Sequence, residues 1–255
     1  MIRWLFFIFL NFQFAFSQVV NIENRRIYDD TAGISGSIFG SFSALQNQNL
    51  LLSGAFRPLV QYKTKMHYYL FIGDWNFSKS AQAVYSNSGM AHFRYAYRLA
   101  FMSKKPKSPW KLEVYSQIQY NQLLRQKMRA LAGSGLRWKI IEKRDRYRVF
   151  WGGSALYEYE VLLDDSVIKN FRFSTYLSWH IGLPGKFTFS GTNYYQPRLD
   201  NFADTRFMGQ YSLSFRLNRS ISLRADANVF YQSRPVENVR STVYNTTLGL
   251  NIGLN

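Results

Sequence analysis

Charged side chains recur at alternate positions within otherwise apolar stretches of this sequence. Arg94 and Arg98, for example, are interleaved with aromatic residues in HFRYAYRL, residues 92–99. Alternate residues of a β-strand share one face, and charges that share a buried face must be paired, because burying an unpaired charge is costly. The residues that define this face are Arg94, Arg98, Glu113, Arg129, Arg137, Arg148, Glu158, Arg172, Arg216, Arg224 and Asp226.

Two kinds of chemistry are open to such a face. Paired charges would fill the barrel interior with a network in which each ion has a partner. Unpaired arginines would instead lower the energy barrier to the passage of anions, as rings of charge do in selective pores. Glu158 and Arg172 lie near facing positions of one expected hairpin, which favours pairing. The expected network joins Arg94, Arg98, Arg137, Arg148 and Arg172 to Glu113, Glu158, Glu160 and Asp226.

Hydrolytic chemistry is a weaker candidate. Of three histidines, His67 and His180 fall near the expected periplasmic strand ends, and His92 is expected to face inward near the outer rim with Ser88 on the same face. A serine hydrolase needs an activated Ser beside its base and an orienting acid or amide, and no Gly-x-Ser-x-Gly elbow accompanies Ser88. We expect no catalytic residue, no metal site and no cofactor.

Composition excludes several other classes. The chain has no Cys, so a disulfide scaffold and a thiolate metal site are impossible. Its 32 Lys and Arg exceed its 15 Asp and Glu, giving a net charge of +17, but these charges are scattered, which argues against a nucleic-acid partner. An aromatic fraction of 18% with a mean hydropathy of -0.25 is typical of strands with one apolar and one polar face.

The first 32 residues divide into two expected segments. Arg3 precedes the apolar run Trp4–Leu10, and small residues lead up to Ser17, which is the pattern of a secretory signal peptide cleaved after residue 17. Residues 18–32 are then a short periplasmic segment, and residues 33–255 form the folded domain.

Alternation with period two runs through that domain and predicts an all-β fold. It is clearest in 206–217, where Phe207, Tyr211 and Leu213 alternate with polar residues. The ranges are long enough to cross a bilayer at a tilt, so we predict a closed antiparallel up-and-down transmembrane β-barrel of about 12 strands. The predicted strands are 33–44, 49–60, 65–77, 88–102, 110–122, 127–140, 146–158, 171–181, 186–196, 206–217, 220–231 and 242–254.

Connections between these ranges suggest an orientation. Short turns such as 218–219 fall at one end, the expected periplasmic end, and the longer segments Ser78–Asn87, Tyr159–Asn170, Pro197–Thr205 and Gln232–Ser241 fall at the other. Two alternatives stay open. Residues 120–131 also have the spacing of a helix face, and a soluble sandwich or lipocalin-like barrel would alternate as well, although twelve such strands would expose too much apolar surface.

Four stretches resemble a known family of unknown function, the one that includes the salt-induced outer-membrane proteins, in the version common in Bacteroidetes. The resemblance covers roughly residues 90–254, and it implies an outer-membrane β-barrel without an established activity. One departure is the end of the chain at Leu254 and Asn255, where such barrels usually carry an aromatic residue that the assembly machinery reads. The stretches are HFRYAYRL (92–99), RALAGSGLR (129–137), ALYEYE (155–160) and TNYYQP (192–197).

Location and activity follow as expectations. We expect an exported protein of the bacterial outer membrane that contacts outer-membrane lipid, lipopolysaccharide and the barrel-assembly machinery. The favoured function is a structural or loop-presenting barrel with a charge-paired lumen. The alternative is a narrow anion-permissive channel for a small anionic solute, and the lesser alternative is an outer-membrane lipid hydrolase.

Overall fold

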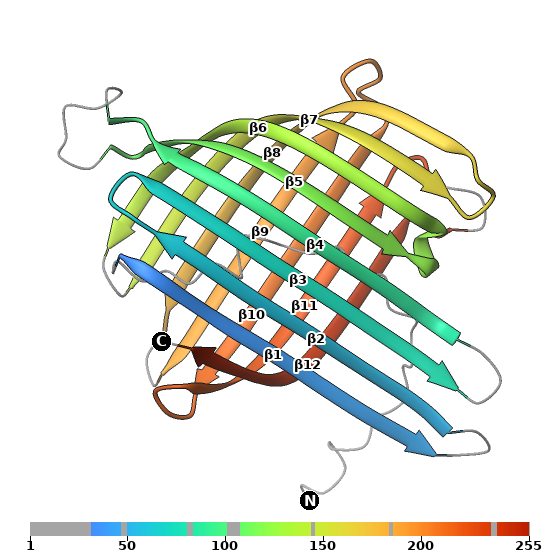
Figure 1. Ribbon diagram of the computed structural model, residues 1–255, viewed down its shortest axis with the longest axis horizontal. Helices are drawn as coiled ribbons and strands as arrows, with labels where there is room; N and C mark the ends of the chain where they lie inside the picture. Colours follow the sequence, from blue (N-terminus) through green and yellow to red (C-terminus); the bar gives the residue numbers. More distant parts are fainter. Residues whose placement is uncertain are drawn as a thin grey trace, which may run out of the picture.

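Twelve antiparallel strands form one closed barrel in the computed structural model (Figure 1). The structure describes residues 32–46, 50–80, 84–100, 108–143, 146–183, 186–235 and 239–254. Each strand pairs with its neighbours in sequence, and β1 pairs with β12, so the predicted up-and-down antiparallel barrel of twelve strands is confirmed. The strands are β1 (Gly33–Gln46), β2 (Leu50–Lys63), β3 (His67–Ser80), β4 (Val84–Arg98), β5 (Trp110–Asn121), β6 (Gln126–Lys143), β7 (Tyr147–Leu162), β8 (Val167–Gly182), β9 (Phe187–Pro197), β10 (Thr205–Arg216), β11 (Ile221–Gln232) and β12 (Thr242–Leu254).

We call the end at which β1 begins and β12 ends the proximal end, and the opposite end the distal end. The predicted signal peptide, nearly all of the predicted segment 18–32 and the basic turn at 104–107 lie outside the described residues. No helix in the described part of the chain is long and apolar enough to cross a membrane.

Alternation sorts side chains between the outer surface and the lumen. On β10, Phe207 and Leu213 are exposed on the outside, whereas Arg206, Gln210 and Ser212 are buried inside. This is the division that the period-two pattern predicted, because successive side chains of a strand point to opposite faces. In Figure 1 the strands of the near wall, β1 to β5, cross those of the far wall, as the strand tilt of a closed barrel requires.

Strands extend further toward the distal end than predicted. The predicted loop Ser78–Asn87 is mostly strand, since β3 continues to Ser80 and β4 begins at Val84; the predicted loop Tyr159–Asn170 shortens to the four residues between Leu162 and Val167. The polar composition of these two segments suggested loops. In the second segment, however, the pairing of β7 with β8 continues as far as Val161 and Val167. Conversely, β4 ends at Arg98, four residues before its predicted end.

Residues 120–131 form a strand, a tight turn and a second strand rather than a helix. A single 3-10 turn, Gln122–Leu124, separates β5 from β6. The side chain of Asn121 accepts hydrogen bonds from the backbone N–H of Leu123 (3.0 Å) and Leu124 (3.2 Å) and so begins the turn. Arg125 ends it in the left-handed conformation, with φ 55°.

The seam that closes the barrel is short. Pairing of β1 with β12 runs only from Gly36–Leu254 to Gly40–Leu250, whereas β1 pairs with β2 over its whole length. Beyond these pairs the described residues of β1 and β12 form no further pairs with each other. Phe42 and Leu248, which would be the next outward pair, are 71% and 66% exposed.

The lumen also holds apolar side chains. Leu70 and Ile72 of β3 are fully buried inside it and pack with Leu59, Tyr68, Met90 and Ala96. A second cluster contains Leu124, Tyr176, Tyr194, Met208 and Phe230. The inner face is therefore not uniformly polar, although the alternation suggested a polar interior.

Candidate functional site: a charge-paired lumen

The distal half of the lumen is occupied by a cluster of ion pairs around Glu158 on β7. Arg129 Nε of β6 donates to Glu158 Oε1 at 2.6 Å, and Arg172 Nε of β8 donates to Oε2 at 2.9 Å. Arg206 of β10 donates to Glu158 Oε1 and, at 3.1 Å, to Glu160 Oε2. Glu158 is 0% exposed and Arg172 is 1% exposed. Three strands other than β7 therefore supply guanidinium groups to one buried carboxylate.

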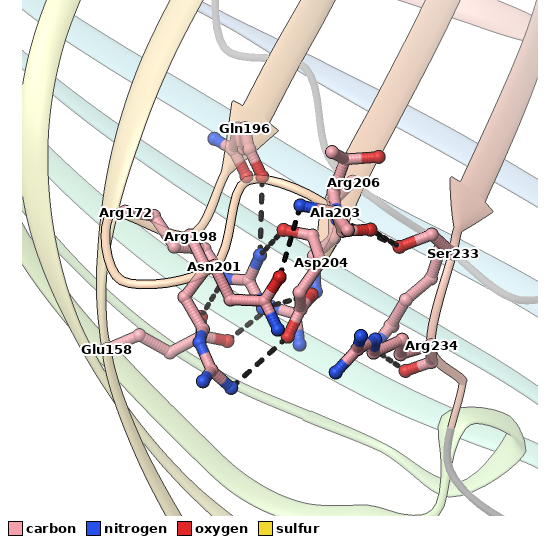
Figure 2. A network of polar contacts seen from close by, with 12 residues as sticks. Glu158, Arg172, Gln196, Arg198, Asn201, Ala203, Asp204, Arg206, Ser233 and Arg234 are labelled. Carbon is pink, nitrogen blue, oxygen red and sulfur yellow. Dashed lines mark hydrogen bonds and ion pairs between the residues drawn. The ribbon is translucent and has the colours of Figure 1, made fainter.

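The loop between β9 and β10 extends this cluster to the mouth of the barrel (Figure 2). Arg172 Nη2 donates to Asp204 Oδ1 at 3.1 Å, and Arg198 contacts both Asp204 (3.4 Å) and Asp200 (2.5 Å). The loop is also fixed through its backbone, because Arg172 Nη1 donates to the carbonyl oxygens of Gln196 and Asp204, each at 3.2 Å. The hydrogen bonds from Arg198 lower the pKa of the Asp200 carboxyl below its usual range.

Charges balance in this distal cluster. Four arginines, Arg129, Arg172, Arg198 and Arg206, face four carboxylates, those of Glu158, Glu160, Asp200 and Asp204. Such matched pairing offsets the cost of removing the ions from water.

A line of amide side chains joins the distal cluster to the centre of the lumen. Gln126 Nε2 donates to Glu160 Oε1 (2.6 Å), Gln119 donates to Gln126 (3.0 Å), and Gln117 donates to Gln119 (2.6 Å). His92 Nδ1 lies 3.1 Å from Gln117 Oε1. The polar interior is thus continuous across β4, β5, β6 and β7.

The centre of the lumen contains a second, smaller ion-pair group. Arg94 Nη1 donates to Glu113 Oε2 at 2.8 Å, and Arg137 Nη1 lies 3.8 Å from the other oxygen. The Arg137 guanidinium also lies over the Phe150 ring, 3.9 Å from its centroid, a cation–π contact. A cavity of about 60 Å³ lies beside this group, which is room for a few water molecules.

A third group lies behind the seam. Arg57 of β2 contacts Asp74 at 3.6 Å and Asp226 of β11 at 3.5 Å, and Arg224 Nε donates to Asp226 at 2.9 Å. The Arg57 guanidinium also lies 4.7 Å from the centroid of Phe39. These contacts join the two sides of the seam from within the lumen.

Several residues singled out in the sequence do not join these groups. Arg98 ends β4 half-buried, without an ion pair to a described residue. Arg148 contacts Glu142 (3.6 Å) rather than one of the expected acids. Arg216 is exposed at the proximal mouth. The remaining eight residues lie in the three groups above.

Six members of the groups were absent from the sequence-based set, namely Arg57, Asp74, Arg198, Asp200, Asp204 and Arg206. Arg206 and Asp74 follow the same alternation as the residues that were chosen, so the strand pattern alone could have found them. Asp204 lies in a connection, where alternation gives no information about direction.

The pair His92 and Ser88 does not form a hydrolytic site. Both side chains extend from β4 into the lumen. Four residues separate them along the strand, which places their backbones roughly 13 Å apart. His92 lies near the middle of β4, not near its rim as expected, because the strand begins at Val84. Within the described ranges no group of three or more His, Asp or Glu could hold a metal ion.

Three solved structures are similar to this chain. The NanC porin is 10% identical, with a TM-score of 0.49, and the match covers 86% of this chain and 98% of the porin. A KdgM porin in complex with disordered oligogalacturonate is 12% identical (TM-score 0.42; 87% and 99% covered), and a bacterial polysaccharide outer membrane secretin is 8% identical (TM-score 0.43; 86% and 96% covered). No curated protein matches the sequence.

A family match covers most of the barrel. The family described as "Protein of unknown function, DUF481" matches residues 59–253, from the second half of β2 to the end of β12. The match begins earlier than the resemblance noted in the sequence, which started near Met90. Since it spans well over half of the chain, the protein belongs to the DUF481 family of proteins of unknown function.

Proposed function

We propose that this protein is a bacterial outer-membrane β-barrel whose lumen is closed by ion pairs, and which acts as a structural or loop-presenting protein. The observation that carries the proposal is the distal cluster, in which Glu158, Glu160 and Arg172 are at most 2% exposed. A barrel of twelve strands is wider than one whose lumen is simply filled by side chains, so closure here depends on charged groups that reach across it.

The outer surface supports the membrane location. Apolar side chains cover the middle of the wall, including Phe71, Val114 and Leu213, and aromatic rings pair along the wall, as in the stacked Trp110 and Trp138 (5.5 Å between centroids). An apolar band with aromatic girdles is the surface that a bilayer requires. In this proposal the proximal end faces the periplasm, the wall contacts outer-membrane lipid and lipopolysaccharide, and the barrel-assembly machinery inserts the chain.

A second candidate is a narrow anion-permissive channel. It is favoured by the distribution of charge along the lumen, since the distal cluster is balanced, the central group has two arginines for Glu113, and the proximal mouth carries further cations. An anion entering from the proximal side would first meet the cations of the proximal mouth. As it moved toward the distal end, the carboxylates of the protein would increasingly compete with it for the arginines.

Single-channel recording in planar bilayers tests both candidates. For the closed barrel we expect no conductance above that of protein-free bilayers, because the buried ion pairs leave no continuous path for water. A steady conductance from the unmodified protein would overturn the closed barrel. If that conductance favours anions and is lost in Arg94→Glu and in Arg137→Glu, the channel is the better account.

A further inference from the structure

The proximal mouth contains a large cavity that the ion-pair groups do not fill. Its volume is about 690 Å³, and the ends of β7, β8, β9 and β10 and the turns between them line it. Its cationic side chains are those of Arg146, Arg148, Lys186 and Arg216, with His180 beside them. Among the described residues of the lining none is acidic. We call these five residues and the cavity between them the vestibule.

Pairing distinguishes the vestibule from the distal cluster. Distal arginines each contact a carboxylate, whereas Arg146, Lys186 and Arg216 make no ion pair with any residue in the described ranges. Arg148 contacts Glu142 at 3.6 Å, and that carboxylate also binds Lys139. The vestibule therefore retains a net positive charge.

Backbone hydrogen bonds hold these cations near one another. Gly182 N donates to the carbonyl of Arg146 at 2.6 Å, which joins the start of β7 to the end of β8. Arg216 N donates to the carbonyl of Lys186 at 3.1 Å, which joins the end of β10 to the turn before β9. Because the cations are fixed on neighbouring elements, their mutual repulsion persists in the folded barrel. A bound anion would relieve it.

We infer that the vestibule is a binding site for a soluble multivalent anion that carries carboxylate or phosphate groups. Clefts lined by charge of one sign concentrate counter-ions, and guanidinium groups bind carboxylate and phosphate with two parallel hydrogen bonds. A ligand with several anionic groups can contact cations from β7, the β8–β9 turn and β10 together. The inference goes beyond the closed barrel, since binding at the mouth requires no passage through the lumen.

Calorimetric titration of the full barrel, in nanodiscs of phosphatidylcholine at low salt, tests this inference with citrate and pyrophosphate as probes. The vestibule variant is Lys186→Gln with Arg216→Gln. The matched control, Lys169→Gln with Arg240→Gln, removes two exposed cations at the distal end. We expect the unmodified protein and the control to bind both probes. We expect the vestibule variant to bind about 25-fold more weakly, because each of the two exposed charges contributes about fivefold.

Two results would overturn the inference. One is no binding by the unmodified protein up to about 10 mM probe; the other is an equal loss in the control, which would indicate unspecific attraction to a basic protein. A third arm uses nanodiscs that contain phosphatidylglycerol. Unchanged citrate binding supports a soluble ligand, and its loss by competition would assign the vestibule to a lipid headgroup instead. Conductance in the bilayer experiment would contradict the closed lumen and leave the citrate result unaffected.

Discussion

Replacing Glu158 by Gln is the most direct test of the distal cluster. The substitution keeps the size of the side chain and removes one charge that three guanidinium groups share: Arg129 at 2.6 Å, Arg172 at 2.9 Å, and Arg206. Because Glu158 is 0% exposed, water cannot reach the site to solvate the guanidinium groups that lose their charged partner. Removing one partner of a buried ion pair costs about 3–5 kcal/mol. We expect the free energy of unfolding to fall by about 3 kcal/mol, the lower end of this range, since the amide oxygen still accepts one hydrogen bond.

Urea unfolding in phospholipid vesicles, followed by the fluorescence of the Trp residues of the barrel, measures this change. The matched control is Glu142→Gln, the same chemical change in a carboxylate that is 29% exposed and contacts Lys139 and Arg148. Its expected cost is below about 1 kcal/mol, as for other partly exposed pairs. Equal losses in the two variants would refute the reasoning, because burial would then make no difference to the value of the charge.

Three further predictions concern the central pair, the wall and the seam. Arg94→Met should cost about 3 kcal/mol in urea unfolding, and adding Glu113→Met with Arg137→Met should recover most of it, because buried apolar side chains replace a buried Arg–Glu–Arg triad at little cost; a triple variant no more stable than Arg94→Met would contradict this. Val114→Arg, mid-strand on the outer surface, should cost about 2–4 kcal/mol in vesicles, whereas Val167→Arg, equally exposed at a strand end, should cost at most about 1 kcal/mol; similar costs would place Val114 outside the hydrocarbon layer. Cysteines at the paired positions Ile38 and Ile252 should form a disulfide on oxidation, seen as a shift on a non-reducing gel, and cysteines at Phe42 and Leu248 should not; cross-linking of both pairs would mean that β1 and β12 pair along their full length.

The fold could be predicted from sequence because its main signal is local. Period-two alternation assigns each residue of a strand to one face without knowledge of its neighbours, so the outward position of Phe207 and the inward position of Arg206 follow from the sequence of β10 alone. Composition was a poorer guide to strand ends. Ser78 and Glu160 are polar but remain in strands, because their backbones continue to pair with the next strand.

Partners within the lumen could be predicted only for neighbouring strands. Arg172 and Glu158 lie on one hairpin, and their pairing followed from the expected turn. Arg206 reaches Glu158 from three strands away, and Arg57 reaches Asp226 across the seam. Such contacts depend on the number of strands and on their stagger around the barrel, which no local pattern encodes.

The seam has a consequence for the order in which the molecule assembles. Every other strand pair is a hairpin that can form between neighbours in sequence, but β1 and β12 can meet only after the ten strands between them are in place. Until that moment both edge strands present free backbone groups to any other chain. The contact of Arg57 with Asp226 spans this junction and forms only on closure. The ion pair is therefore present in closed barrels and absent from open sheets. A variant that lacks it should show its effect first as a lower yield of closed barrels.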